Sequence, residues 1–345
     1  MNGARVMNLV VSLREGAGKH DAIEVARGWL DDFNEVALAT VVSTWGSAPV
    51  PVGGQLVVAP GERFEGSVSG GCVEVDVIAE ATNVMATGRS RLLEFGIEDE
   101  VAWRSGLPCG GTIKVFLEPL NVTSDAAYLD AILAARRSRT TLGVVTNLVT
   151  DVRQILEPSS VREEPLAGAL NSGESRVLEL AEGQVFLHIL RPAVRIVAVG
   201  ATHVGQVLAD LALGVGYDVV IVDPRAVFAS EERLGRTSVI TEWPELSFKG
   251  LGLDDRTAVV ALTHAAHLDD EALTAALRSN CLYIGALGSK KTHAKRLERL
   301  GAQGVSEKDL ARIRAPVGLS IGAKGPAEIA VSILAEIIKN SHGAL

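Results

Sequence analysis

The chain contains little cysteine and no apolar run long enough to span a bilayer. Three cysteines in 345 residues provide no disulfide framework. None stands in a Cys-x-x-Cys pair, which argues against a zinc ribbon or a thioredoxin-type site. This usage predicts a reducing, cytoplasmic environment. The short apolar patch at 6–13 lacks a cleavage site, so we expect neither a signal peptide nor a membrane segment.

Aromatic side chains are also scarce, and the 33 basic side chains are outnumbered by 42 acidic ones. A net charge of -9 and an aromatic content of 4% argue against a nucleic acid or an anionic membrane as the main partner. The serine-hydrolase elbow, the Walker A loop, the HExxH helix and iron–sulfur cysteine spacing are all absent. What remains is a globular composition, 47% hydrophobic and 22% charged, with a length that predicts two domains.

A glycine-rich stretch surrounds one of the cysteines, in Gly66-Ser67-Val68-Ser69-Gly70-Gly71-Cys72-Val73-Glu74. Apolar residues three and four apart predict a helix over 73–87, with Gly88 as its stop. Cys72 should therefore lie at or just before a helix N-terminus, where unpaired N–H groups attract anions and favour a thiolate. A thiolate attacks electrophiles, carries sulfur or binds a soft metal. The alternative is a small apolar side chain beneath a tight turn.

A second cysteine lies in a similar loop, Gly106-Leu107-Pro108-Cys109-Gly110-Gly111, before a predicted strand at 112–118. The third, Cys281, opens an apolar strand and is expected to be structural. The first half otherwise mixes helices, indicated by the spacing of apolar residues, with strands, indicated mainly by β-branched and apolar content. The helices are expected at 21–33 and 126–137, and the strands at 36–44, 55–59, 63–68, 91–95, 142–149, 152–156 and, in two pieces, 175–190. We expect a polar, turn-rich segment at 157–174 and a domain boundary at Arg191-Pro192, which divides the chain into domains 1–190 and 191–345.

The second half alternates strands and helices. Strands are expected at 194–199, 218–222, 257–262 and 282–285, and helices from the Gly200 loop to 214 and at 326–339. This order predicts a doubly wound parallel sheet of the Rossmann type, so the fold class is α/β throughout.

The loop Gly200-Ala201-Thr202-His203-Val204-Gly205 stands where a dinucleotide fingerprint belongs, after a strand and before a helix. Asp223 follows the second strand, where an acidic residue would hold a ribose. Arg225 could take a 2′-phosphate or pair with Glu231. Thr202 replaces the middle glycine that lets a pyrophosphate approach, although its hydroxyl could contact a phosphate. Nucleotide binding and a Rossmann scaffold that binds no dinucleotide both stay open.

Two further loops follow strands on the same rim. His264 and His267, three apart, could face a metal, but no third ligand is evident, so we do not expect one. The loop at 285–292 carries glycines and two lysines that suit a phosphate or carboxylate. Its alternative is a helix N-cap at Ser289 followed by solvated Lys290 and Lys291.

Taken together, these motifs resemble the XdhC/CoxI family of accessory factors for xanthine dehydrogenase and related molybdenum hydroxylases. In the first half the resemblance is carried by Ala39-Thr40-Val41-Val42, Gly46-Ser47-Ala48-Pro49, the Gly66–Glu74 stretch and Cys109-Gly110-Gly111-Thr112. In the second half it is carried by Gly200 with His203-Val204-Gly205, Asp223-Pro224-Arg225, Thr263-His264, Tyr283-Ile284-Gly285-Ala286-Leu287-Gly288-Ser289, Pro316-Val317-Gly318-Leu319, and Pro326 with Glu328-Ile329-Ala330.

The resemblance implies a maturation chaperone rather than a catalyst. Such factors bind the molybdenum cofactor (molybdopterin), protect it while its terminal oxo ligand is exchanged for sulfur from a cysteine desulfurase, and hand it to the hydroxylase. Carried over, Cys72 and Cys109 would face the cofactor and its metal. The cofactor-binding residues around them would be Ser69, Gly70, Gly71, Glu74, Gly110 and Gly111. We expect the two loops to converge on one pocket that the Rossmann-like rim closes, and a homodimer that helps to shield the cargo.

The chain departs from the family pattern at Val50, where arginine is usual, and at Gly54, where serine is usual. Thr202 stands in place of glycine, and Ala327 in place of an acidic residue. An alternative function is an NAD(P)-dependent oxidoreductase that uses Gly200, Thr202, His203, Gly205, Asp223 and Arg225. A third is an interaction protein in which both glycine loops serve only as tight turns.

Overall fold

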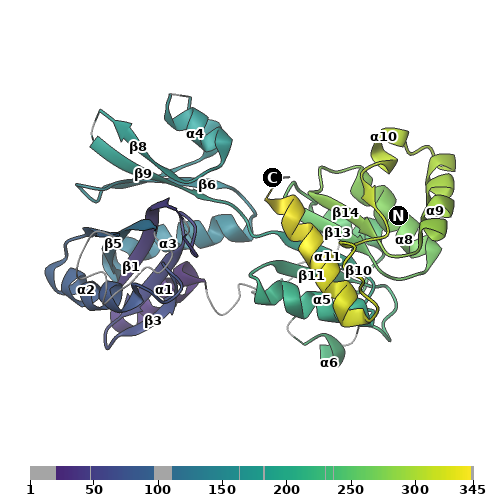
Figure 1. Cartoon of the computed structure of the whole chain (residues 1–345), viewed down its shortest axis with the longest axis horizontal. Coiled ribbons are helices and arrows are strands. Elements are labelled where there is room, and N and C mark those ends of the chain that lie inside the picture. The colour runs from purple at the N-terminus through teal and green to yellow at the C-terminus, as the bar shows by residue number, and fades with distance from the viewer. Residues whose placement is uncertain are drawn as a thin grey trace, which may run out of the picture. The chain divides into compact units, whose positions relative to one another are not determined.

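A computed structural model describes residues 21–46, 48–96, 111–162, 164–181, 183–229, 231–235 and 237–342. The chain divides into two compact units, one within Lys19–Pro192 and one that includes Ala193–Leu345. In Figure 1 the colour runs from purple to teal along the first unit and from teal-green to yellow along Ala193–Leu345. No helix of the described part is both long and apolar enough to cross a membrane.

The first unit is built on a five-stranded antiparallel sheet in the order β3-β2-β1-β5-β4. Its strands are β1 (Glu35–Trp45), β2 (Gln55–Ala59), β3 (Arg63–Gly66), β4 (Arg91–Phe95) and β5 (Thr112–Asn121). Side chains alternate along β1 because successive residues of a strand point to opposite faces. Val36 and Leu38 pack with α1 (Ala22–Phe33) and α3 (Val122–Arg137), whereas Ala37 and Ala39 pack with α2 (Glu74–Thr87).

A second antiparallel sheet completes this unit, in the order β7-β6-β9-β8. Its strands are β6 (Leu142–Asn147), β7 (Arg153–Leu156), β8 (Arg176–Leu180) and β9 (Gly183–Leu190). The segment predicted as turn-rich contains a short 3-10 turn, η1 (Pro158–Ser160), and a helix, α4 (Leu166–Ser172), that the sequence reasoning missed. Two buried residues of α4, Ala169 and Leu170, pack on Leu187 of β9.

The two sheets are joined by a buried ionic cluster. Arg153 of β7 lies 3.2 Å from the Glu118 carboxylate of β5 and also pairs with Asp125 of α3. Its guanidinium lies 4.5 Å from the ring centroid of Tyr128. Burial raises the pKa of Glu118 to about 7 even though Arg153 acts in the opposite direction. The Arg153 guanidinium thus forms ion pairs with two buried carboxyl groups, those of Glu118 and Asp125.

The second unit confirms the predicted Rossmann-type sheet. Six parallel strands lie in the order β12-β11-β10-β13-β14-β15. They are β10 (Arg195–Val199), β11 (Asp218–Val222), β12 (Ser238–Ile240), β13 (Thr257–Ala261), β14 (Tyr283–Ala286) and β15 (Ile313–Arg314). The central strands are buried on both faces, as a parallel sheet covered by helices requires.

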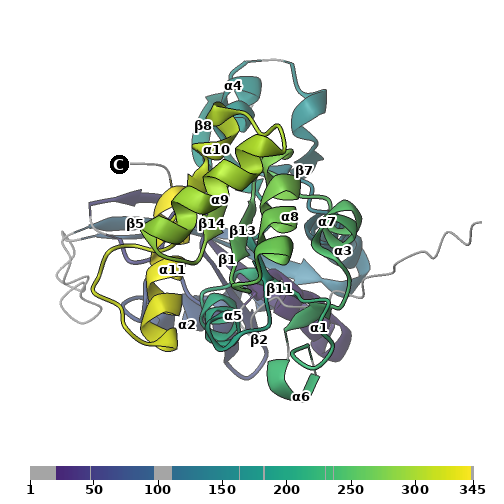
Figure 2. The ribbon, with the colours of Figure 1, turned by 90° about the vertical axis from the view of Figure 1, so that its right-hand side faces the viewer.

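Helices cover both faces of this sheet. One face packs on α5 (His203–Gly214) and α11 (Pro326–Ser341). The other packs on α7 (Pro244–Leu251), α8 (Ala266–Leu277) and α9 (Lys290–Ala302), with α8 and α9 in front of β13 and β14 in Figure 2. The short helices α6 (Glu231–Leu234) and α10 (Glu307–Leu310) lie in the connections. Successive strands are added to one side of β10 up to β12 and to its other side from β13 onward. The loops after β10 and β13 therefore lie at the switch point of the sheet.

Candidate functional site

Cys72 lies in the loop that joins β3 to α2, directly before the helix N-cap at Val73. This is the position that the glycine-rich pattern predicts. The Cys72 side chain is partly buried and packs on the apolar cluster between α2 and the five-stranded sheet. Ile113 of β5, four positions after Cys109, belongs to the same cluster. Cys109 and Gly110 lie outside the described residues, so the convergence of the two cysteine loops stays a prediction.

The backbone of this loop depends on glycine. Gly66 has a φ of +94°, and a Cβ built there would lie 2.3 Å from the carbonyl oxygen of Gln55. Gly70 and Gly71 also have positive φ values, of +77° and +113°, a region that residues with side chains rarely adopt. A Cβ at Gly71 would meet nothing within 4 Å. The three glycines therefore differ, since only Gly66 is also confined by a neighbouring strand.

Six consecutive backbone N–H groups of the loop, those of residues 68–73, donate to side-chain oxygens of the same motif. Val68, Ser69 and Gly71 donate to the Glu74 carboxylate at 3.2, 2.9 and 2.8 Å. Cys72 and Val73 donate to the Ser69 hydroxyl, both at 2.9 Å. Gly70 donates to the Ser67 hydroxyl, also at 2.9 Å. Both hydroxyls in turn donate to Glu74.

Glu74 is thus the centre of the loop. It is the first residue of α2 and is only 7% exposed. Burial by itself raises the pKa of a carboxyl group, but hydrogen bonds from the hydroxyls of Ser69 and Ser67 and from the Ser69 N–H outweigh it and lower the pKa of Glu74 to about 2. Val73 at the N-cap has no side chain that could cap the helix. Ser69 and Glu74 accept hydrogen bonds from the loop residues that lead into the helix, Cys72 and Val73 among them, rather than from its first turn.

This network engages the backbone donors of the loop. The N–H groups of residues 68–73, which precede the helix, already donate to Ser67, Ser69 and Glu74. A carboxylate of the chain itself also stands at the helix N-terminus, where a bound anion would otherwise be stabilised. Thus Ser69 and Glu74 hold the loop that carries Cys72. The assignment of Ser69, Gly70, Gly71, Glu74 and Gly111 to cofactor binding stays a prediction.

Two of the departures from the family pattern lie next to each other. A Cβ built on Gly54 would approach Val50 Cγ1 to 2.2 Å and the carbonyl oxygen of Pro51 to 3.1 Å. Val50 packs with Ala48 on the same apolar cluster as Cys72. Glycine at position 54 therefore leaves the space that Val50 occupies, and the two departures are sterically coupled.

In the Rossmann-type unit, the Gly200 loop keeps the first and last glycines for packing. Gly200 has a φ of +117°, and a Cβ there would meet Thr263 at 3.0 Å, while a Cβ on Gly205 would meet the Gly200 carbonyl oxygen at 2.5 Å. Thr202 is the N-cap of α5, and its hydroxyl accepts a hydrogen bond from the Gly205 N–H at 3.3 Å. His203 is exposed at the first position of that helix.

Asp223 is fully buried and engaged on both carboxylate oxygens. One oxygen accepts from the Ala201 N–H at 2.9 Å, and each oxygen accepts from the Arg225 guanidinium at 2.8 Å. The Arg225 N–H adds a fourth bond at 3.0 Å. Despite burial, hydrogen bonds from Arg225 and Ala201 keep the pKa of Asp223 below its usual value. A ribose hydroxyl would have to displace Arg225 from this carboxylate.

The other rim loops also have local structural roles. Ser289 is the N-cap of α9, accepting a hydrogen bond from the Thr292 N–H at 3.2 Å, and Lys290 and Lys291 are exposed. His264 is exposed with a φ of +60°, and the ring of exposed His267 lies 6.0 Å from that of Trp243. Among the described residues, no group of three or more His, Cys, Asp or Glu side chains is arranged to hold a metal ion.

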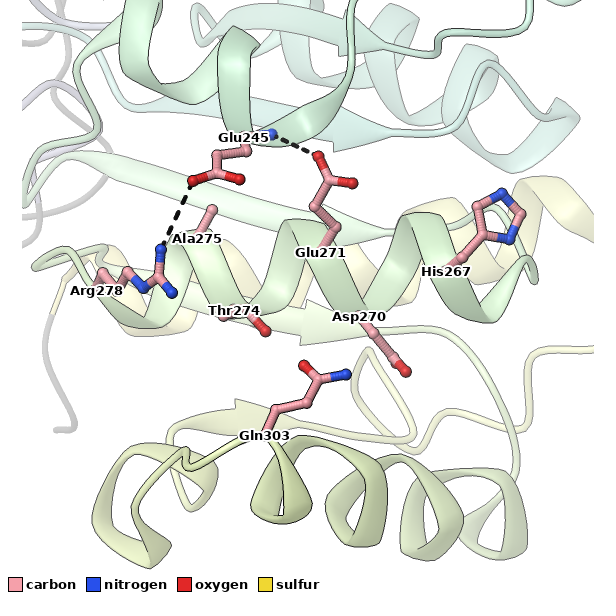
Figure 3. Close-up of a pocket in the computed structure, with 8 residues that line it drawn as sticks. All are labelled: Glu245, His267, Asp270, Glu271, Thr274, Ala275, Arg278 and Gln303. Carbon is pink, nitrogen blue, oxygen red and sulfur yellow. Dashed lines mark hydrogen bonds and ion pairs between the residues drawn. The ribbon is translucent and has the colours of Figure 1, made fainter.

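A pocket of about 380 Å³ lies along α8, between α7 and the end of α9 (Figure 3). Its charged side chains interact with other protein groups. Glu245 lies 3.8 Å from Arg278, the Glu245 N–H donates to Glu271, and Asp270 accepts two hydrogen bonds from Arg299. The pocket contains neither Cys72 nor any of the rim residues predicted for a nucleotide.

The fold and these loops define a class of protein in which a thiol-bearing α/β unit is linked to a Rossmann-type unit. The chain belongs to the XdhC and CoxI family. The sequence profile of that family matches residues 16–96, and that of the XdhC Rossmann domain matches residues 196–337.

Two relatives match along most of their length. The molybdenum cofactor insertion chaperone PaoD of Escherichia coli is 32% identical over 87% of this chain and 81% of its own. A protein of Bacillus subtilis named as a probable xanthine dehydrogenase subunit is 28% identical over 90% of this chain and 94% of its own. A crystal structure described as a xanthine dehydrogenase from Bacillus halodurans has a TM-score of 0.79 at 25% identity, covering 94% of this chain and 97% of that one.

Proposed function

We propose that this protein is a molybdenum cofactor chaperone that holds the cofactor through Cys72 and Cys109 and delivers it to xanthine dehydrogenase or a related hydroxylase. The observation that carries the proposal is the position of Cys72, on a hydrogen-bonded glycine loop at the start of α2, in a chain 32% identical to a cofactor insertion chaperone over 87% of its length. A thiolate is a soft ligand suited to molybdenum or to sulfur transfer.

The cofactor is cargo in this proposal, and the protein supplies binding and shelter. Cys72 supplies a partly buried thiol beside an apolar cluster that includes Ile113. Cys109 is proposed to face the same cargo because Ile113 follows it by four positions. Protection during sulfuration, with a cysteine desulfurase as the sulfur source, and a homodimer that encloses the cargo are further parts of the proposal.

The test is pterin extraction from protein produced in a host that makes the cofactor. Wild type is expected to carry extractable pterin, and Cys72→Ala and Cys109→Ala to lose most of it. Cys281→Ala is the matched control, because Cys281 lies in the other unit next to the Ser279 hydroxyl at 3.1 Å. Normal pterin content in the Cys72→Ala, Cys109→Ala double variant would overturn the proposal.

A further inference from the structure

The loop that carries Cys72 contains two serines with different connections. The Ser69 hydroxyl accepts the N–H groups of Cys72 and Val73 and donates to Glu74. The Ser67 hydroxyl accepts the N–H of Gly70 and donates to Glu74 at 2.7 Å. Both serines bond to the same carboxylate, but only Ser69 bonds to the backbone of Cys72.

Ser69 is also the more confined of the two. It is fully buried, and the Glu74 carboxylate accepts hydrogen bonds from both the hydroxyl and the backbone N–H of Ser69. A hydroxyl has one proton to donate and two lone pairs to accept with. The Ser69 hydroxyl donates its proton to the Glu74 carboxylate, and its two lone pairs accept hydrogen bonds from the N–H groups of Cys72 and Val73. Its orientation is therefore fixed, and it fixes the peptide that precedes the Cys72 side chain.

We infer that Ser69 and Glu74 are positioning residues that set the direction of the Cys72 thiol toward its cargo, an inference that rests on the proposed function. Glu74 holds Ser69, and Ser69 holds the Cys72 backbone. Neither residue needs to touch the cargo. Their role differs from that of a ligand because the oxygens involved are already bonded within the loop.

The inference predicts two effects of opposite direction in Ser69→Ala. Without the hydroxyl, the Cys72 peptide loses its acceptor and the partly buried thiol becomes more accessible. Alkylation of Cys72 by iodoacetamide should then be at least threefold faster, while the pterin that copurifies should fall at least threefold. Ser67→Ala, which removes hydrogen bonds of the same loop but none to Cys72, should change either quantity less than twofold.

The measurement is mass-spectrometric alkylation kinetics on the full chain, with Cys281 in the same sample as an internal reference. Because Cys281 lies in the other unit, it reports unfolding of the whole chain, which would accelerate both cysteines. A cooperative urea or thermal transition of Ser69→Ala that begins only beyond the assay conditions shows that the unit that carries Cys72 is folded while its alkylation is measured. Glu74→Gln is the second variant and should act as Ser69→Ala does, since it removes the charge that holds Ser69. Equal Cys72 rates in Ser69→Ala and Ser67→Ala, or unchanged rates in both Ser69→Ala and Glu74→Gln, would overturn the inference.

The alkylation arm needs no cofactor, which separates this inference from the proposed function. Normal pterin in the double cysteine variant with faster alkylation in Ser69→Ala would remove the cargo role and keep the positioning. Pterin loss in the cysteine variants with unchanged alkylation in Ser69→Ala and Glu74→Gln would keep the cargo role of the cysteines and remove the positioning role of Ser69 and Glu74.

Discussion

Glu74 accepts two hydrogen bonds from Ser69, one from its hydroxyl and one from its backbone N–H at 2.9 Å. The two residues are five positions apart, and the turn between them contains Gly70 and Gly71, both with positive φ. A buried carboxylate therefore occupies the centre of a turn that, by its glycine content alone, resembles an empty anion-binding loop. This pairing leads to the first prediction.

Replacing Glu74 by Gln should destabilise the protein in a pH-dependent way. Because the folded-state pKa is lowered from 4.5 to about 2, the carboxylate contributes stability that is present above pH 4.5 and lost as the pH falls through about 2. A shift of this size corresponds to about 3 kcal/mol. Urea unfolding at pH 7 and at pH 3.5 should show a smaller gap between wild type and variant at the lower pH.

The matched control for that prediction is Asp76→Asn in the same first turn of α2. Asp76 is exposed, so its removal should cost about 0.3–1 kcal/mol through the helix dipole. A Glu74→Gln effect as small as that of Asp76→Asn would show that the buried network contributes little to stability.

Alanine substitutions at Gly66 and Gly71 should have unequal costs. Both residues have positive φ, which strains alanine by about 1–3 kcal/mol. Gly66→Ala adds a Cβ 2.3 Å from the Gln55 carbonyl oxygen, whereas Gly71→Ala places its Cβ in open space. Thermal or urea unfolding should show the larger loss for Gly66→Ala. Equal losses would mean that β2 yields to the new methyl group without cost.

The protein should give no binding heat with NAD, NADH, NADP or NADPH in calorimetry. Asp223, the expected ribose acceptor, is buried and bonded to Arg225 and to the Ala201 N–H. Thr202 replaces the glycine that admits a pyrophosphate, and its hydroxyl caps α5. A dehydrogenase of known affinity serves as the positive control. Micromolar binding of any of the four would restore the oxidoreductase alternative.

The Glu118 cluster predicts a pH dependence of opposite sign. Burial raises the folded-state pKa of Glu118 to about 7. The stability it contributes is therefore fully present below pH 4.5 and lost as the pH rises through about 7. Wild type should lose stability relative to Glu118→Gln between pH 5 and pH 8.5, measured as urea midpoints.

Glu94→Gln is the control for this titration, since Glu94 is exposed and pairs with Lys114 at 3.1 Å on the same sheet. Its difference from wild type should stay nearly constant over the same pH range. A gap between wild type and Glu118→Gln that does not change with pH would mean that Arg153 keeps Glu118 ionised in the folded protein.

The sequence by itself determined the fold class and most of the local elements, α4 being an exception. Short apolar runs between turn residues predicted β2, β4 and β11 at their observed bounds, and the alternation of strands and helices in the second half predicted the parallel sheet. The glycine–cysteine loops pointed to the family that the comparisons show. These features are local in sequence, so spacing and residue type are enough to indicate them.

Only the tertiary structure decided what the polar residues of the loops do. Spacing placed Asp223 where a ribose acceptor belongs, but its bonds to Arg225 and Ala201 depend on how the loops after β10 and β11 meet. Ser69 and Glu74 are predicted from the sequence as cofactor-binding residues, a prediction that stays untested, and the structure shows that their side chains bond to the loop backbone that carries Cys72. A side-chain oxygen has the same chemistry toward a ligand and toward an N–H of its own chain, and only the folded positions of the donors show which of them it meets.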